Sequence, residues 1–303
     1  MSTDTLRTGA NTTQKLSAKQ ILRSSLKPSP TIESIFKYVV VILVCAAFFA
    51  PFIYAISTSL KSQVQMLQQP RAFFPLPLHP KNYVEVFNSY PVIRYFRNTL
   101  IVVGAVLVCN LLVSSFAGYA LSRIQWKGRE AFFMLTVSTM FMPLFLLLLP
   151  RFLIFKELGM LGTLLPLIIA PALGSPTSIF LMRQYYRSIP MDLSEAAMID
   201  GCSEFGIYWR IILPLTKPAL ATIAIFTVRW RWNDFIQPLI YLQSEKLYTV
   251  TMGLYTIMGT SAEEINIHHV MAFVIMSIAP MIFIFLAAQR HFVEGTTHTG
   301  LKG

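Results

Sequence analysis

A short group of polar and aromatic side chains interrupts one long apolar stretch of the chain. The stretch runs from Pro218 to Leu242, and the group consists of Arg229, Arg231, Trp232, Asn233 and Asp234. If the stretch spans a bilayer as a helix, Arg229 lies about 17 Å from Pro218, near the middle of a ~30 Å hydrocarbon core. A charge at that depth is costly unless it faces a water-filled cavity or a partner, so these residues predict a functional site.

These charges fit two interpretations. Successive helical residues are about 100° apart, so Arg229 and Arg231 lie about 200° apart and cannot share one face. In the first interpretation Arg231 pairs with Asp234 at i+3, and a partner protein holds Arg229. In the second, one arginine faces a path for a solute, where Trp232 offers a ring for stacking and Asn233 an amide for hydrogen bonds.

Other reactive side chains form no set that would indicate an enzyme. A membrane enzyme needs a nucleophile, a base or a metal site gathered at one depth, and no such combination stands out. Three cysteines, Cys45, Cys109 and Cys202, do not make a disulfide framework. The five histidines lack the spacing of metal ligands, so we predict no metal site.

The composition is that of a polytopic membrane protein. Hydrophobic residues make up 54% of the chain and charged residues 13%, against about 25% charged in soluble proteins. Apolar runs long enough to span a bilayer occur at Tyr38–Ser59, Asn98–Ser122, Ala131–Pro150, Thr163–Met182, Pro218–Leu242 and Val270–Ala288. The runs are continuous rather than alternating, so we expect an all-α protein with six transmembrane helices.

Basic residues near the span ends predict the orientation. With a cytoplasmic N-terminus, 15 Lys and Arg fall in cytoplasmic pieces and eight in outer pieces, while two lie within a span. Both termini are then cytoplasmic, as is the loop of residues 183–217. Residues 1–36 are polar and predict a mobile extension before a six-helix membrane domain of residues 37–303, which ends in a cytoplasmic tail from about residue 289. No basic soluble domain supports nucleic-acid binding, so membrane lipid is the expected surrounding.

The loop between the fourth and fifth spans has a regular local pattern. Asp192 and Glu195 have the spacing of a capping box, with Asp192 as the N-cap. A short helix is expected from Leu193 to Asp200, and Gly201 can end it because glycine takes the left-handed conformation cheaply.

A second short helix is expected after this turn, with Ser203 as its cap. Apolar residues then recur at i, i+3, i+4 and i+7, which predicts one apolar face made by Phe205, Tyr208, Trp209 and Ile212. Pro214 and Pro218 mark the break into the next apolar stretch. The loop is therefore predicted to be a helix-turn-helix that projects from the membrane.

Seven of the loop's residues carry a family resemblance: Glu195, Ala196, Ala197, Gly201, Ile211, Leu213 and Pro214. Their spacing resembles the E-A-A-x3-G-x9-I-x-L-P pattern of membrane subunits of ATP-binding cassette importers. In that family the segment is a coupling loop that docks into an ATPase subunit. The resemblance implies that the docking residues here are Glu195, Ala196, Ala197, Asp200, Gly201, Phe205, Ile211, Leu213 and Pro214.

Further motifs resemble the MalG-like branch of sugar-type permeases. They are Asn98-Thr99, the run Ala117–Arg123, Gly128, Pro143, Pro150, Leu158-Gly159, Trp232-Asn233-Asp234 and the C-terminal run Gln289–Gly303. The resemblance implies a permease of the bacterial cytoplasmic (inner) membrane that imports a carbohydrate. It also implies three kinds of partner: a second, MalF-like permease, an ABC ATPase dimer and an extracytoplasmic solute-binding protein.

The same resemblance implies that this chain is not an enzyme and binds no cofactor. The chain has no G-x-x-x-x-G-K-[ST] loop, so ATP and Mg²⁺ are expected on the partner ATPase. The arginines before Trp232 depart from the apolar or small residues expected in this branch. This departure favours an acidic sugar over a neutral one as the substrate. The alternative is an ion-coupled secondary transporter of a small polar solute, for which Asp234 is the single intramembrane acid.

Overall fold

The computed structural model describes residues 32–259 and 266–297, with side chains from 34 to 259 and from 266 to 287. Most of the predicted N-terminal extension and the end of the predicted tail lie outside these residues. The contacts divide the chain into two units, Met1–Ile53 and Tyr54–Gly303. Over the described residues the regular structure is entirely helical, as predicted.

The first unit contains most of helix α2, which runs from Ile32 to Ser59. Its residues from Ile35 to Ile53 are all exposed. Side chains with such an apolar composition are suited to a lipid or protein surrounding rather than to water. The segment Ser34–Ser59 is long and apolar enough to cross a membrane, in agreement with the first predicted span.

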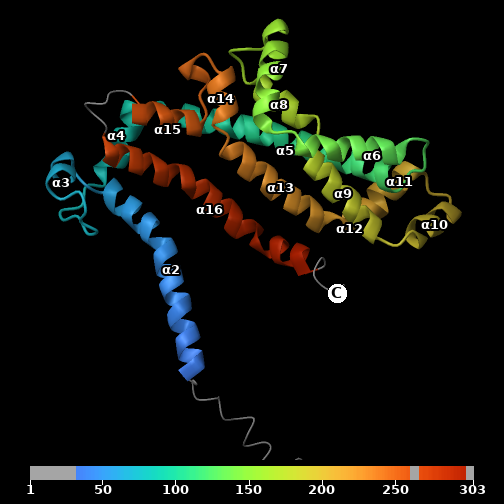
Figure 1. The fold of residues 1–303 in the computed structure, drawn as a ribbon, viewed down its shortest axis with the longest axis horizontal. Helices are drawn as coiled ribbons and strands as arrows, with labels where there is room; N and C mark the ends of the chain where they lie inside the picture. Colours follow the sequence, from blue (N-terminus) through green and yellow to red (C-terminus); the bar gives the residue numbers. More distant parts are fainter. Residues whose placement is uncertain (1–31, 260–265, 298–303) are drawn as a thin grey trace, which may run out of the picture. The chain divides into compact units, whose positions relative to one another are not determined.

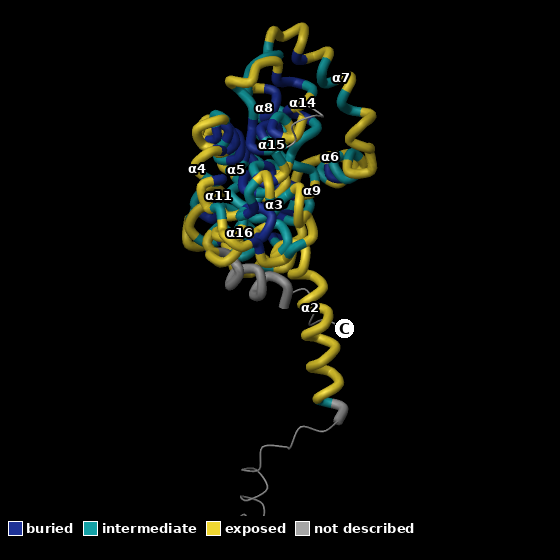
Figure 2. Tube along the Cα trace, turned by 90° about the vertical axis from the view of Figure 1, so that its left-hand side faces the viewer, coloured by how far each residue is buried: buried dark blue, intermediate teal, exposed yellow. Residues whose placement is uncertain are grey.

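The second unit is built around α5, a helix of 31 residues from Val92 to Ser122 (Figure 1). Helices α8, α9, α13 and α15 pack against α5, and α16 packs against α13, α15 and α4. The bounds of these helices are Lys81–Ser89 for α4, Leu165–Ala172 for α8, Pro176–Ser188 for α9, Lys217–Trp232 for α13, Val250–Gly259 for α15 and Ile267–Thr297 for α16. Burial is concentrated along α5 and its neighbours (Figure 2).

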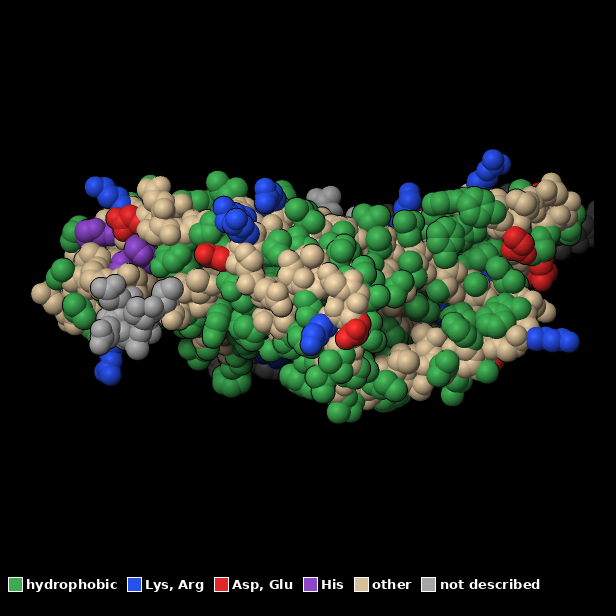
Figure 3. Space-filling model, turned by 90° about the horizontal axis from the view of Figure 1, so that it is seen from above, with side chains coloured by type: hydrophobic (Ala, Val, Ile, Leu, Met, Phe, Trp, Pro, Cys, Tyr) green, Lys and Arg blue, Asp and Glu red, His purple; other side chains and the backbone are tan. Residues whose placement is uncertain are grey.

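Shorter helices complete the second unit. They are α3 (Gln63–Gln68), α6 (Arg129–Ser138), α7 (Leu144–Glu157), α10 (Asp192–Ile199), α11 (Glu204–Ile207), α12 (Leu213–Leu215) and α14 (Ile236–Tyr241), with 3₁₀ turns at Thr139–Phe141 and Glu245–Leu247 and a π-helical turn at Tyr208–Ile212. Hydrophobic side chains predominate on the face drawn in Figure 3, where charged side chains are few and scattered.

Close packing of α5 on α9 depends on a glycine. A Cβ atom added to Gly118 would lie 2.6 Å from the Cβ atom of Met182, closer than real Cβ contacts come. Met182 is fully buried in a cluster with Tyr119, Tyr186 and Tyr208. Gly118 therefore lets the two helices approach at the end of α5 that faces the predicted loop.

The described residues contain four helices that are long and apolar enough to span a membrane, and up to six spans if each of two bent pairs counts as one. The expectation of a continuous helix over Ala131–Pro150 is wrong, because the chain turns by 103° between Arg129–Phe141 and Leu144–Glu157. Pro143 lies at this break, where a proline disfavours helical conformation in the residue before it. The predicted stretch Pro218–Leu242 is also divided, into α13 and α14.

The start of α5 is tied to the segment that precedes α15. The Asn98 amide nitrogen donates to the backbone oxygens of Lys246 and Tyr248, both at 3.0 Å. The Thr99 hydroxyl accepts from the backbone nitrogen of Val250 at 2.9 Å. The Asn98-Thr99 pair thus fastens residues 246–250 to α5.

Candidate functional site: the docking segment and the cavities beside α5

The loop of residues 189–217 contains the predicted helix-turn-helix. Helix α10 ends before Gly201, which has φ of +80°. The amide nitrogens of Gly201 and Cys202 donate to the backbone oxygens of Met198 and Ala197, at 3.0 and 2.9 Å. This is the hydrogen-bonding pattern of a helix that ends on a left-handed residue. The predicted stop at Gly201 is confirmed.

Of the two predicted helix caps, one is confirmed and the other is wrong. The Ser203 hydroxyl accepts from the backbone nitrogen of Gly206 at 3.2 Å, so Ser203 caps α11 as expected. The predicted capping box of Asp192 and Glu195 is wrong, because α10 begins at Asp192 itself and its N-cap, Met191, makes no side-chain bond. Asp192 instead lies in the first turn, where a negative charge still favours the helix.

The apolar face predicted after Ser203 is present but only partly buried. The rings of Phe205, Tyr208 and Trp209 contact one another, and Tyr208 and Ile212 lie in one buried cluster. Phe205 and Trp209 are 62% and 42% exposed, so this face offers two aromatic side chains to the surface. The turn at Tyr208–Ile212 is π-helical and not α-helical as expected.

Residues 192–214 are called the docking segment below, after their predicted role. Their exposed side combines charge, small residues and apolar side chains. Glu195, Ala196, Asp200 and Gly201 are exposed, while Ala197 is buried beneath them. Ile199 is 87% exposed, and Leu193, Met198 and Phe205 are further exposed large apolar side chains of the segment. Exposed apolar side chains with charged neighbours are typical of a protein-binding surface.

The remaining predicted docking residues lie nearer the membrane-spanning helices. Ile211 and Leu213 are half-buried, and both pack against the buried cluster that contains Tyr186 and Tyr208. Pro214 is exposed within α12. The segment from Glu204 to Leu215 turns by 74° into α13, where Pro218 occupies the first turn.

The buried side of the docking segment is held by polar bonds to α5. The Ser115 hydroxyl lies 2.7 Å from the Tyr186 hydroxyl and 2.8 Å from the Tyr208 hydroxyl. One turn further along α5, the Tyr119 hydroxyl donates to Oε2 of Glu204 at 3.0 Å. These bonds join helices far apart in the sequence beneath the exposed surface.

Two buried arginines also hold helices together in this part of the chain. From the sequence, neither was assigned a structural role. Arg123 donates to backbone oxygens that precede α10, and burial lowers the pKa of its guanidinium, while Tyr119 acts in the opposite direction. Arg183 on α9 donates to both carboxylate oxygens of Glu130, at 2.6 and 2.7 Å. Its guanidinium also lies 3.7 Å from the ring centroid of Phe133. Arg183 therefore fastens α6 to α9.

The ion pair predicted in the fifth apolar stretch is confirmed. Nη1 of Arg231 lies 3.3 Å from Oδ2 of Asp234, and both side chains are largely buried. The other carboxylate oxygen of Asp234 accepts from the backbone nitrogen of Gln237 at 3.3 Å, at the start of α14. The Thr251 hydroxyl donates to the backbone oxygen of Asp234 at 2.6 Å. These three contacts hold the chain in one conformation at the break between α13 and α14.

Trp232 is not placed where a solute could stack on it. It is 4% exposed, and its ring nitrogen donates to the backbone oxygen of Ser277 on α16 at 3.1 Å. The ring also makes an edge contact with Phe96. The accessible aromatic side chain is Trp230, which is 69% exposed and lines two cavities. Helical spacing alone does not say which of the two faces α16.

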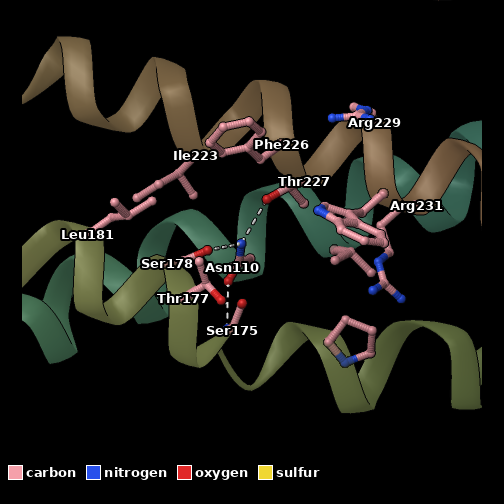
Figure 4. Close-up of a pocket in the computed structure, with 13 residues that line it drawn as sticks. Asn110, Ser175, Thr177, Ser178, Leu181, Ile223, Phe226, Thr227, Arg229 and Arg231 are labelled. Atoms are coloured by element: carbon pink, nitrogen blue, oxygen red, sulfur yellow. Dashed lines mark hydrogen bonds between the residues drawn. The ribbon is translucent and has the colours of Figure 1, made fainter. Parts of the chain in front are cut away.

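The first cavity, of about 530 Å³, lies between α5, α9 and α13 (Figure 4). Asn110 of α5 lines it and donates to the hydroxyls of Thr227 and Ser178, at 2.8 and 3.2 Å. Its Oδ1 accepts from the backbone nitrogen of Ser175 at 2.9 Å and from the Ser114 hydroxyl at 3.0 Å. This network joins three helices at one depth, and its hydroxyl groups border the cavity.

The predicted path arginines both line this cavity. Arg229 and Arg231 extend from different sides of α13 (Figure 4), as their spacing predicted. Among the described residues, Arg229 has no ion-pair partner, whereas Arg231 pairs with Asp234. Thr177 also borders the cavity and is exposed.

The second cavity, of about 510 Å³, shares Arg231 with the first. Its polar lining includes Asn233, Asp234, Gln237 and, from α7, Arg151. Arg151 was missed because the sequence assigned it to an outer loop, and only the bend before α7 shows that it borders the same cavity. Among the described residues, no group of His, Cys, Asp or Glu could hold a metal ion.

Comparisons with known proteins agree with this architecture. Residues 110–298 match the family described as the inner membrane component of binding-protein-dependent transport systems. The arabinooligosaccharides transport system permease protein AraQ of Halalkalibacterium halodurans is 35% identical over 232 residues, which are 76% of this chain and 82% of that protein. The melibiose/raffinose/stachyose import permease protein MelC of Bacillus subtilis is 32% identical over 263 residues, covering 86% and 94%.

A solved structure shares the fold. The crystal structure is that of a bacterial ABC transporter involved in the import of the acidic polysaccharide alginate; one of its chains aligns with a TM-score of 0.78 and 27% identity. The alignment covers 86% of this chain and 96% of that one. The chain is therefore a member of the family of inner membrane components of binding-protein-dependent transport systems, a multi-pass transport subunit and not an enzyme.

Proposed function

We propose that this chain forms half of the translocation pore of an ATP-driven importer for a carbohydrate. The observation that carries this proposal is the exposed docking surface of α10 and the turn at Gly201, supported from below by buried bonds to α5. The relatives named above are permeases for arabinooligosaccharides and for melibiose, raffinose and stachyose, which favours a sugar substrate. An ion-coupled transporter would leave the docking surface without a purpose.

Three kinds of partner follow from this proposal. A second, MalF-like permease supplies the other half of the pore, an ABC ATPase dimer binds ATP and Mg²⁺, and an extracytoplasmic solute-binding protein delivers the sugar. Residues 37–303 form the permease domain. The loop of residues 183–217, the N-terminal extension of residues 1–36 and the tail from residue 289 lie on the cytoplasmic side.

The docking surface suits an ATPase subunit for a simple physical reason. Ala196 and Gly201 have almost no side chain, so a partner backbone can approach α10 closely. The apolar side chains of Ile199 and Phe205 are exposed to water in the free chain. Their burial against a partner stabilises a complex. Glu195 supplies a charge that an arginine or lysine of the partner can pair with at the rim.

The first cavity, beside α5, and the second cavity, between α7, α8 and the break after α13, are the proposed substrate path. Hydroxyl and amide groups around the first can bond sugar hydroxyls, and Trp230 offers an aromatic face for a sugar ring. The charge balance favours an acidic sugar, because Arg151, Arg229 and Arg231 line the cavities and Asp234 is the single carboxylate among the lining residues. The similar fold of an alginate importer chain supports the same substrate class.

The experiment that tests the function is gentle purification of the tagged chain from its native membrane. We expect one similar permease and two copies of an ATPase to accompany it, and the associated binding protein to bind carbohydrates in a direct screen. Uronate oligosaccharides should bind more tightly than neutral oligosaccharides of the same length. A chain that purifies alone, or only with itself, would overturn the proposal.

A further inference from the structure

Arg123 is a buried cation that has no carboxylate partner among the described residues. It forms the C-cap of α5 and is 7% exposed. The described ion pairs of this part of the chain involve Glu130, which pairs with Arg129 and Arg183 but not with Arg123. A buried charge is costly unless its hydrogen bonds are satisfied, so the groups around Arg123 must be accounted for.

Backbone oxygens at the end of α9 and between α9 and α10 accept most of the hydrogen bonds that Arg123 donates. Nη2 of Arg123 donates to the oxygen of Tyr186 at 2.7 Å and also to that of Ile189, while Nε donates to the Tyr186 oxygen at 3.2 Å. Nη1 donates to the oxygen of Pro190 at 3.3 Å. One guanidinium thus binds three backbone oxygens of the chain that leads into α10.

The same side chain also reaches the start of α10. Nη1 lies 3.0 Å from the sulfur of Met191 and 3.4 Å from the hydroxyl of Ser194, which is buried in the first turn of α10. Arg123 therefore contacts the end of α9, the connecting residues and the beginning of α10 together.

The chemistry of these contacts requires arginine. The last backbone oxygens of a helix have no partner within the helix and carry the negative end of its dipole, and a cation there is favourable. Arginine has five donors in a rigid planar fork, whereas lysine has one compact charge with three donors. A lysine at this position can keep the charge but cannot reach all of these acceptors.

Arg123 connects the docking segment to a helix that is distant in the sequence. Tyr119 lies one turn earlier on the same face of α5 and bonds Glu204 at the start of α11. The end of α5 thus holds α10 through Arg123 and α11 through Tyr119. The docking segment is covalently joined to α9 and α13, which pack against α5, and the bonds of Arg123 and Tyr119 join its two helices directly to the end of α5.

The other functional feature of α5 is Asn110, which borders the first cavity. It lies 13 residues from Arg123 along one continuous helix, a distance of about 20 Å. Helices transmit displacements as rigid bodies. A movement of α10 that is passed to Arg123 therefore reaches the cavity.

We propose that Arg123 is the positioning residue that couples movement of the docking segment to α5 and so to the cavity. This inference rests on the proposed function, because it takes the ATPase to move α10. A role limited to folding predicts that loss of Arg123 reduces assembly, and that assembled complexes work normally. A coupling role predicts assembled complexes in which nucleotide no longer changes the cavity.

The test uses the whole complex and a cysteine probe in the cavity. Cys45, Cys109 and Cys202 are replaced by serine, and Thr177→Cys supplies one thiol at the cavity edge. The rate of labelling by a small, charged, water-soluble methanethiosulfonate reagent is measured without nucleotide and after ATP hydrolysis in the presence of vanadate, which traps ADP in the ATPase. This readout needs no knowledge of the sugar. ATPase content and ATP hydrolysis are measured on the same samples.

With Arg123 present, we expect trapping to change the labelling rate at least about fivefold, within the usual range of coupling between sites. Arg123→Gln should keep the bound ATPase and its hydrolysis but lose this change, and Arg123→Lys should keep an intermediate response. Lys127→Gln removes an exposed cation from the connection between α5 and α6 and should respond like the parent.

Two results would overturn the inference: a full nucleotide response in Arg123→Gln, or failure of both Arg123 variants to assemble. A parent complex that contains no ATPase would instead contradict the proposed function.

Discussion

The docking segment and the cavity region are both fastened to α5, but they use its polar groups in different ways. Beneath the docking segment, Ser115, Tyr119 and Arg123 are satisfied by bonds within the chain. Around the cavities, Asn110 is satisfied in the same way, but Arg229 has no ion-pair partner among the described residues and Thr177 is exposed.

In the proposed function, this difference separates two tasks. A surface that transmits movement must not yield, and a dense network of buried bonds fixes its geometry. A site that binds and releases a solute needs donors and acceptors that are free to bond to it. The end of α5 near Arg123 has the first property, and the region around Arg229 has the second.

The largest expected effect comes from breaking the docking surface. Gly201→Asp places a side chain at φ of +80°, where a side chain is strained, and adds a charge to the surface that we propose meets the ATPase. Glu195→Lys reverses the charge on α10. We expect each to lower ATP-driven uptake by about 100-fold or more, since both contacts with the ATPase and its coupling are affected.

Both docking variants should remain in the membrane, because no Cβ clash arises at position 201 and Glu195 is exposed. Lys127→Gln is the control, since it changes an exposed charge outside the segment. Full uptake with normal ATPase assembly in both docking variants would contradict the assigned surface.

A smaller and selective effect is expected at the cavity. Arg229→Gln and Arg231→Gln should reduce uptake of an acidic oligosaccharide about tenfold, because a charge-assisted hydrogen bond is lost, and should change uptake of a matched neutral one less. The measurement is initial uptake at several concentrations for both sugars. Equal loss of uptake for the two sugars would show that these arginines do not distinguish substrates by charge.

The network around Asn110 should affect stability more than recognition. Asn110→Leu leaves the buried partners Ser178 and Thr227 without their shared donor. We expect a loss of about 1–3 kcal/mol, the usual cost of unsatisfied buried polar groups. Thermal unfolding of the purified complex measures this loss, and Ser114→Ala, which removes a single bond of the network, should cost less.

The smallest effect is expected at Trp232. Trp232→Phe keeps an aromatic ring against Phe96 and loses one bond to the Ser277 oxygen, which should cost about 1 kcal/mol. Uptake by the assembled complex should stay close to the parent value, whereas Trp230→Ala should reduce it. A large and specific loss of uptake in Trp232→Phe would return this residue to the substrate path.

Features that depend on neighbours in the sequence were predictable. The helix stop at Gly201, the Ser203 cap and the Arg231–Asp234 pair follow from backbone propensity and helical spacing, and the structure has all three. The apolar composition likewise predicted a helical membrane protein.

Features that depend on distant parts of the chain were not predictable. The acceptors of Arg123 are mainly backbone oxygens, which every residue has, so the sequence holds no signal for them. Arg151 and Arg231 line the same cavity only because the chain bends before α7. The π-helical turn at Tyr208 is another case, because local propensity does not distinguish it from an α-helical turn.

The most direct test of the account is cross-linking at α10. In a chain whose three cysteines are replaced by serine, Ala196→Cys is coupled in the native membrane to a short reagent that binds the thiol at one end and carries a photoreactive group at the other. We predict a cross-link to the ATPase subunit, and none for Asn88→Cys, an exposed position on α4. Absence of any ATPase cross-link at position 196, in membranes where the complex purifies intact, would contradict the central claim that this surface docks the ATPase.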